Sequence, residues 1–237
     1  MKPIIVTGYI PLYNNYRSND EYIKIGKQFL NCGLPIVAFI DDSVNIELDK
    51  QVIRYSTNLN SCWLTPYNNK KLPPTDNPTK DTAQYHSIQF QKTKWVSQVS
   101  KLHDSQLYIW IDFGILHVPG VTIDIIKEFY TNVCLLDYNG KLDKITMASI
   151  WKLTNDSIID FLKPNWYLAG GTFIVPRNLT NWFSGEVERQ TVSYINKSGY
   201  LTWEINIWAQ TIQTNPELFQ VWYCDHNKTM FSNICTL

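Results

Sequence analysis

The sequence has no excess of charge of either sign, no long hydrophobic run and no closely spaced pair of cysteines. Among its 237 residues, 21 basic side chains balance 21 acidic ones, so the formal net charge is zero. A protein that covers a long stretch of nucleic acid normally gathers an excess of Lys and Arg on one face. We therefore expect no nucleic-acid partner.

Membrane and secretory signals are also missing. No apolar run reaches the roughly 18 residues that would suggest a transmembrane helix. The first residues, Met1–Val6, lead directly into a strand pattern and leave no room for a signal peptide. The five cysteines are odd in number and include no CxxC pair, which favours neither a zinc site nor a disulfide framework. We expect a soluble, cytoplasmic protein without a transmembrane segment.

What the chain does contain is a globular composition with many aromatic side chains. Hydrophobic residues make up 44% of the chain and charged residues 18%, which argues against general disorder. Aromatic residues reach 14% and include nine Trp, more than a core alone requires. Surplus Trp and Tyr often line sugar or base pockets, although they are also good core material.

A strand, a helix and a second strand follow one another at the start of the chain. Pro3–Ile10 is a short run rich in β-branched residues, which predicts a buried strand. Asp20 is expected to cap a helix that stops before Gly33, and Pro35–Ile40 predicts the second strand. This βαβ unit implies a right-handed crossover and a parallel pair of strands.

The rest of the chain continues the alternation. Residues 56–81 form a polar segment with four prolines, and a loop of this length is usually functional or mobile. Thr82–His103 predicts a long helix that leads to the strand pattern of Tyr108–Gly114. The pattern favours an α/β fold with a mostly parallel central sheet and helices on both faces. The remaining helix and strand candidates are Val52–Tyr55, Thr122–Tyr130, Val133–Leu136, Ile145–Phe161, Tyr167–Val175, Glu186–Asn196, Thr202–Ile212 and Phe219–Cys224.

The most informative segment is Tyr108–Gly114, in which a buried strand pattern ends on Asp112. Open α/β sheets bind ligands at the carboxyl ends of their strands, and the segments Thr7-Gly8-Tyr9 and Asp41-Asp42 end two other expected strands. A solvated turn would explain Asp41-Asp42 equally well. Asp112 has apolar neighbours, where an unpaired charge is costly, and this favours a functional role.

Two phosphate-binding motifs are absent. No GxGxxG follows the first strand, and GxxxxGK[ST] occurs nowhere in the chain. A pyrophosphate at this edge of the sheet would therefore need another source of positive charge. A divalent ion such as Mg²⁺ or Mn²⁺, held by a carboxylate, is the usual source.

Several segments follow one another in a characteristic order along the chain: Val6-Thr7-Gly8-Tyr9, Arg17, Lys92-Thr93-Lys94-Trp95, Ile109-Trp110-Ile111-Asp112-Phe113-Gly114, Leu168-Ala169-Gly170-Gly171-Thr172-Phe173 and Trp203-Glu204. This order resembles the HtrL/YibB-like family and, more broadly, the GT-A-fold nucleotide-sugar glycosyltransferases. The resemblance covers most of the chain and implies a single GT-A-like, Rossmann-related domain over residues 1–237. It also implies transfer of a hexose-type sugar from a nucleoside-diphosphate donor, expected to be UDP-linked.

The resemblance also implies a metal. In such enzymes a DxD motif holds Mn²⁺ or Mg²⁺ and the donor diphosphate, and here Gly114 stands in place of the second Asp. Asp112 is therefore expected either to bind the metal or to contact the donor ribose or sugar. These enzymes often bring a C-terminal His to the metal, which makes His226 a candidate second ligand. A surface His on a tail is the alternative.

Other positions are candidates for binding the donor. The fork of Arg17 suits a diphosphate, and the ammonium of Lys92 or Lys94 could reach a phosphate. A loop ion pair, or a solvated helix face, would explain the same residues. Gly170-Gly171 would let backbone N–H groups approach sugar hydroxyls, or would mark a β-bulge.

Glu204 is the candidate general base. Thr202 is expected to cap a helix that starts at Trp203, so Glu204 falls in the first turn, where the helix dipole favours a carboxylate without any catalytic role. It also heads an apolar row, a setting that suits a general base. An inverting transferase needs one such carboxylate to deprotonate the acceptor hydroxyl.

The sequence thus predicts a metal-dependent glycosyltransferase that acts on a glycan or glycoconjugate hydroxyl. Two other classes stay open. A nucleotidyltransferase would normally carry a basic Gly-rich loop after the first strand, which Gly8-Tyr9-Ile10-Pro11 is not. A non-catalytic nucleotide-sugar or glycan-binding module fits the incomplete DxD motif. The expected donor site comprises Thr7, Gly8, Tyr9, Arg17, Asp41, Asp42, Lys92, Lys94, Asp112, Gly170 and Gly171.

Overall fold

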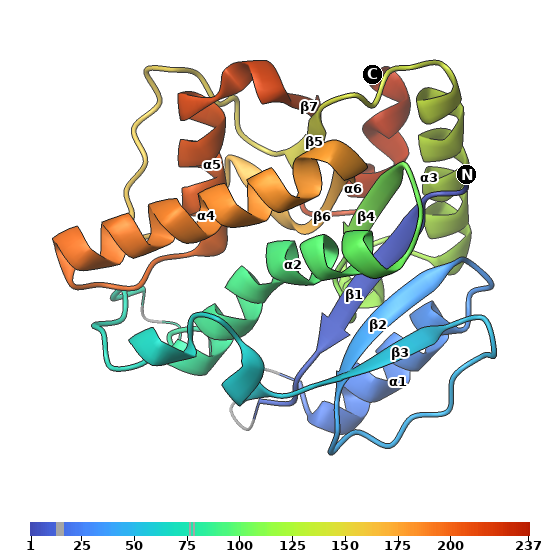
Figure 1. Cartoon of the computed structure of the whole chain (residues 1–237), viewed down its shortest axis with the longest axis horizontal. Helices are drawn as coiled ribbons and strands as arrows, with labels where there is room; N and C mark the ends of the chain where they lie inside the picture. Colours follow the sequence, from blue (N-terminus) through green and yellow to red (C-terminus); the bar gives the residue numbers. More distant parts are fainter. Residues whose placement is uncertain (13–16, 76, 78) are drawn as a thin grey trace.

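A computed structural model describes residues 1–12, 17–75, 77 and 79–237 of the chain. Within these residues seven strands form one sheet in the order β3-β2-β1-β4-β6-β5-β7 (Figure 1). The predicted α/β fold class is confirmed. The strands are β1 (Ile4–Tyr9), β2 (Ile36–Asp41), β3 (Ile53–Thr57), β4 (Leu107–Ile111), β5 (Ile145–Ser149), β6 (Leu168–Pro176) and β7 (Phe219–Tyr223).

The sheet is mostly parallel. Strand β6 runs antiparallel to its neighbours β4 and β5. All the other neighbouring strands of the described sheet pair in parallel. The order β3-β2-β1-β4 is the first part of the doubly wound order, in which the direction of strand addition reverses between β1 and β4. Ligands of such sheets bind outside the carboxyl ends of the two strands at this switch point.

Helices cover both faces of the sheet, as predicted (Figure 1). Successive residues of a strand point to opposite faces, and Ile109 and Trp110 of β4 accordingly belong to two separate hydrophobic cores. One core includes residues of α1 (Asn19–Leu30), α3 (Ile123–Tyr138) and α6 (Thr229–Ser232). The other includes residues of α2 (Ala83–Leu102), α4 (Arg177–Ser198) and α5 (Glu204–Thr214).

Two helix starts differ from the prediction. Helix α1 is capped by Ser18, not by Asp20, because the Ser18 hydroxyl accepts from the backbone N–H of Glu21 while the Glu21 carboxylate accepts from the backbone N–H of Ser18. Helix α5 begins after Trp203 without a side-chain cap. The hydroxyl of Thr202 instead donates to the carbonyl of Phe161 at 2.7 Å.

Two other segments also differ from the expected elements. Thr122–Tyr130 and Val133–Leu136 are parts of the single helix α3, whose buried side chains keep a helical spacing. Ile145–Phe161 contributes only strand β5, after which residues 150–167 run without regular structure. A segment of this length without helix or strand is uncommon in a compact domain and is usually either functional or a linker.

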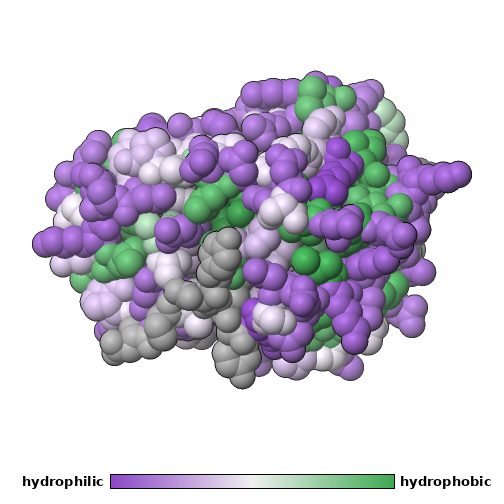
Figure 2. All heavy atoms as spheres, turned by 90° about the horizontal axis from the view of Figure 1, so that it is seen from below, coloured by the Kyte–Doolittle hydropathy of each residue, from purple (hydrophilic) through white to green (hydrophobic). Residues whose placement is uncertain are grey.

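Figure 2 shows the molecule from below, where hydrophobic patches interrupt a mostly hydrophilic surface. In the part of the chain that the structure describes, we find no helix with both the length and the apolar composition needed to span a bilayer.

Candidate functional site

A cavity of about 840 Å³ lies at the switch point of the sheet. Gly8 and Tyr9 from the end of β1 and Asp112 from the end of β4 form part of its wall. Gly170 and Gly171 of β6 contribute a third part, and Lys92 of α2 and Glu204 of α5 complete this side. A volume of this size is typical of sites for small molecules.

Three charged side chains from different elements meet in the wall, and we call Lys92, Asp112 and Glu204 the Lys92 cluster. The ammonium of Lys92 lies 3.1 Å from Oδ1 of Asp112 and 3.3 Å from Oε1 of Glu204. It also donates to the backbone carbonyl of Gly170 at 2.9 Å. The side chains of Lys92 and Glu204 are only 3% and 5% exposed, whereas that of Asp112 is 33% exposed.

In the cluster, two carboxyl groups face one ammonium. Burial by itself lowers the pKa of Lys92, but the carboxylates of Asp112 and Glu204 together outweigh burial and raise that pKa above its ordinary value. Lys92 therefore stays protonated at neutral pH. Its Nζ also lies 5.9 Å from the ring centroid of Trp208.

The carboxylate of Asp112 is fixed by its neighbours. The indole N–H of Trp110, two residues earlier in the chain, donates to Oδ1 at 2.6 Å. The backbone N–H of Asp112 donates to the carbonyl of Gly171 at 3.0 Å and so ties the end of β4 to β6. Asp112 is thus a positioned carboxylate on the cavity wall.

Glu204 is positioned differently. Its Oε1 accepts from Lys92, while Oε2 is buried and has no hydrogen-bond partner among the described residues. Burying such an oxygen costs free energy unless a hydrogen-bond donor binds to it. Oε2 is therefore a candidate for accepting a proton from a bound hydroxyl.

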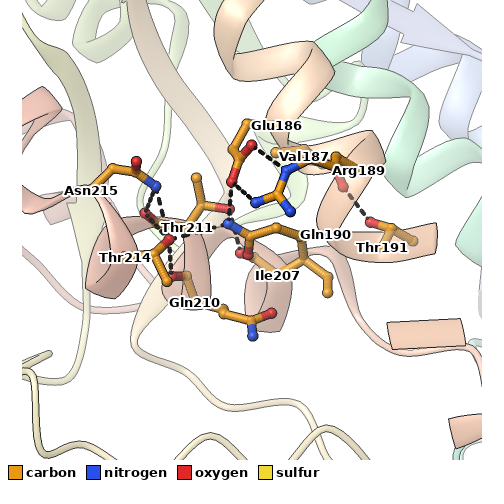
Figure 3. A network of polar contacts seen from close by, with 10 residues as sticks. All are labelled: Glu186, Val187, Arg189, Gln190, Thr191, Ile207, Gln210, Thr211, Thr214 and Asn215. Atoms are coloured by element: carbon orange, nitrogen blue, oxygen red, sulfur yellow. Dashed lines mark hydrogen bonds and ion pairs between the residues drawn. The ribbon is translucent and has the colours of Figure 1, made fainter. Parts of the chain in front are cut away.

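A polar network lies along helices α4 and α5, the second of which begins at Glu204 (Figure 3). The side-chain amide of Gln190 in α4 donates to Glu186 at 2.7 Å and to the hydroxyl of Thr214 in α5 at 3.2 Å. Within α5, the hydroxyl of Thr211 donates to the carbonyl of Ile207. The bond from Gln190 to Thr214 links the two helices at the end of α5 opposite Glu204.

The glycine pair makes room for the cluster. A Cβ on Gly170 would lie 2.8 Å from Oε1 of Glu204, and one on Gly171 would lie 2.9 Å from Cε of Met230. The pairing of β5 with β6 also shifts register next to the pair, in accord with the β-bulge reading. Any side chain at Gly170 would displace Glu204.

Other residues of the wall are aromatic and basic. The ring of Tyr9 stacks on Phe113 with centroids 4.5 Å apart. Arg17 and Lys80 both line the cavity, and the Nζ of Lys80 lies 5.8 Å from the ring centroid of Trp203. His117 also lines the cavity; burial is the main cause that lowers its pKa, and the charges of Arg17 and Lys80 lower it further.

Sequence reasoning missed three of these residues. Lys80 belongs to the long polar segment 56–81, whose length was the only signal for it. Tyr85 lines the cavity beside the cluster, and burial, followed by the charges of Glu204 and Asp112, raises its pKa well above the ordinary value. Trp166 also lines the cavity, and its ring stands edge-on to His226 at 4.4 Å.

Four predicted donor-site residues lie outside this cavity. Thr7 is fully buried in β1, and its hydroxyl has no partner among the described residues. Asp41, the last residue of β2, accepts from the backbone and the hydroxyl of Ser43, and Asp42, in the turn that follows, accepts from the hydroxyl of Ser56. Strand β2 is also one position further from the switch point.

Lys94 is the fourth residue outside the cavity. Its ammonium pairs with Glu188 of α4 at 3.0 Å. Two residues along a helix correspond to a rotation of about 200°, so Lys92 and Lys94 cannot face the same site. Lys92 is therefore the lysine of this pair that belongs to the cavity.

The residues around Asp112 do not fit a divalent metal centre well. His226 lines the cavity, and burial foremost lowers its pKa, which leaves a neutral ring suitable for a ligand. However, the described residues contain no group of three or more His, Cys, Asp or Glu that could hold a metal. Mg²⁺ takes oxygen ligands at about 2.0–2.1 Å, and at Oδ1 of Asp112 it would lie against the buried ammonium of Lys92.

No protein-family model matches the chain, and no curated protein matches it.

Proposed function

We propose that the protein transfers a hexose-type sugar from a nucleoside-diphosphate donor, UDP-linked in the first instance, to a hydroxyl of a glycan or glycoconjugate. The observation that supports this most is the pair of carboxylates, Asp112 and Glu204, which a buried lysine holds in one wall of a cavity at the switch point. The order of motifs that resembles the GT-A glycosyltransferases points to the same chemistry. The α/β fold agrees with it but does not by itself imply an activity.

Different residues of the cavity wall suit the nucleoside, the diphosphate and the sugar of such a donor. Tyr9, stacked on Phe113, offers an aromatic surface for the nucleoside. Arg17 and Lys80 offer positive charge to the diphosphate. Asp112 and the glycine pair then face the sugar.

Glu204 is the group that would act as the base. The acceptor hydroxyl attacks the anomeric carbon, the bond from that carbon to the diphosphate oxygen breaks, and the hydroxyl proton passes to Oε2 of Glu204. The nucleoside diphosphate leaves with the bonding electron pair. Because Oε1 is bound to Lys92, Oε2 is the oxygen left to receive the proton.

A non-catalytic nucleotide-sugar-binding module is the second candidate. It is favoured by the same ion pairs, because buried networks of one lysine and two carboxylates also occur for purely structural reasons. The five cysteines are free, which suits either protein in a reducing compartment such as the cytoplasm.

Incubation of the protein with a panel of nucleotide sugars, with and without Mn²⁺, separates the candidates. Release of the nucleoside diphosphate and a glycosylated acceptor supports the transferase. Tight binding of a donor without any turnover supports the module. Release of pyrophosphate from a nucleoside triphosphate and a sugar phosphate would show a nucleotidyltransferase instead.

A further inference from the structure

Three basic side chains among the described residues line the cavity, and one of them, Lys92, is already paired with carboxylates. Next to Asp112, the ammonium of Lys92 occupies the inner side of the carboxylate at 3.1 Å from Oδ1. Arg17 and Lys80 line the same cavity as His117, and their positive charges both lower the pKa of that ring. Asp112, which also lines the cavity, acts on the pKa of His117 with the opposite sign.

We propose that the site binds a nucleoside diphosphate without a divalent metal, with Arg17 and Lys80 facing the diphosphate and Lys92 occupying the side of Asp112 where a metal would sit. This inference rests on the proposed function. It departs from the metal dependence that the resemblance implies.

The position of Lys92 carries the first half of the proposal. Its ammonium has four oxygen contacts, to both carboxylate oxygens of Asp112, to Oε1 of Glu204 and to the carbonyl of Gly170. With only 3% of its side chain exposed, it cannot swing away into solvent without leaving two carboxylates unpaired. Lys92 is a positioning residue here, because the oxygen contacts of its ammonium are to Asp112, Glu204 and Gly170 and it acts through the two carboxylates.

Lys80 carries the second half. It precedes α2 directly, its Nζ lies over the ring of Trp203, and both residues line the cavity. The positive charge of Lys80 also lowers the pKa of His226, which lines the same cavity. Lys80 is therefore a basic residue of the cavity wall and a direct candidate for a phosphate contact.

Calorimetry with UDP on metal-stripped protein tests the proposal. We expect UDP to bind in EDTA, and Mn²⁺ to change the Kd by less than about threefold. Lys80→Ala should weaken UDP by about tenfold to a hundredfold while leaving uridine unchanged, as expected for a lost charge-assisted bond to phosphate. Lys94 pairs with Glu188 outside the cavity, so Lys94→Ala should change neither the Kd of UDP nor that of uridine. UDP binding that requires Mn²⁺ would overturn the proposal.

Thermal unfolding with Mn²⁺ alone provides a test that needs no donor. Wild-type protein should show no rise in Tm with Mn²⁺, whereas Lys92→Met should gain one, because Asp112 and Glu204 then lack a cation. A rise in the wild type would contradict the proposal. If Lys92→Met does not fold, the wild-type measurement and the Lys80 variant still decide. If UDP does not bind under any condition, the proposed function with this donor is contradicted. The Tm of the wild type with Mn²⁺ would still show whether the site binds the metal.

Discussion

Lys92 and Glu204 form an ion pair of 3.3 Å although 112 positions separate them in the chain, and both side chains are almost completely buried. Such a pair contributes little to stability compared with apolar residues of the same size, but removal of one partner leaves a buried charge without compensation. A side chain without a positive charge at position 92 should therefore destabilise the protein.

Lys92→Ala should lower the free energy of unfolding by about 3–5 kcal/mol, because it leaves the carboxylates of Glu204 and Asp112 without their shared cation. Urea denaturation at pH 7 measures this change. Lys94→Ala is the matched control, since its partner Glu188 is 40% exposed and an ion pair of that kind contributes about 0–1 kcal/mol. Equal losses in the two variants would mean that the buried pair is not the cause.

Strands β1, β2 and β4 were predictable because each is a short apolar run that lies next to a proline or ends at a carboxylate. The strand expected at Pro3–Ile10 is observed as Ile4–Tyr9, and the helix expected at Thr82–His103 is observed as Ala83–Leu102. The same local patterns placed Asp112 at the end of β4, on the cavity wall.

The Lys92 cluster was not predictable in the same way. Nothing local distinguishes Lys92 from Lys94, because the difference depends on how α2 is rotated against the sheet and on where α5 ends up. The role of Gly170 likewise appears only when Glu204 is brought within contact distance across the fold. Lys80 lies in the segment 56–81, which is long and polar but contains no pattern that identifies a single residue.

Gly170→Ala should displace Glu204, because the new Cβ would lie 2.8 Å from Oε1 and 3.7 Å from the Nζ of Lys92. We expect lower stability and loss of sugar transfer, measured by urea denaturation and by release of the nucleoside diphosphate. Gly185→Ala is the control, because nothing lies within 4 Å of its Cβ in helix α4. That variant should gain up to about 1 kcal/mol, since alanine favours a helix. A neutral effect at Gly170 would show that the cluster tolerates movement.

His86 should make the protein less stable in mild acid. Its ring is fully buried in α2 between Tyr85 and Trp203, and burial lowers its pKa from 6.5 to about 4, although Asp81 acts in the opposite direction. The folded state thus holds a neutral ring, while the unfolded chain takes up a proton below its own pKa. The contribution is present above about pH 6.5 and is lost as the pH falls towards 4, by about 3 kcal/mol at most.

Urea denaturation at several pH values between 7 and 4.5 measures the effect of His86. The pKa values of His117 and His226 are also lowered, so they add to the same trend and the wild-type slope alone does not identify the residue. His86→Phe replaces the imidazole with an aromatic ring that takes up no proton. The variant should therefore lose less stability than the wild type between pH 7 and 4.5. An identical slope in the variant would contradict the assignment to His86.

Glu204→Gln tests the proposed base. The substitution keeps the size of the side chain and an oxygen for Lys92, but it removes the group that accepts the proton, so turnover should fall by about a hundredfold or more. The Kd of the nucleoside diphosphate should stay within about threefold of wild type, since the diphosphate is assigned to Arg17 and Lys80. Asp112→Asn is the comparison, because it should weaken the binding of the intact donor as well as turnover. Unfolding of the Glu204→Gln protein, or full turnover in it, would show instead that Glu204 only starts helix α5 and holds Lys92 in place.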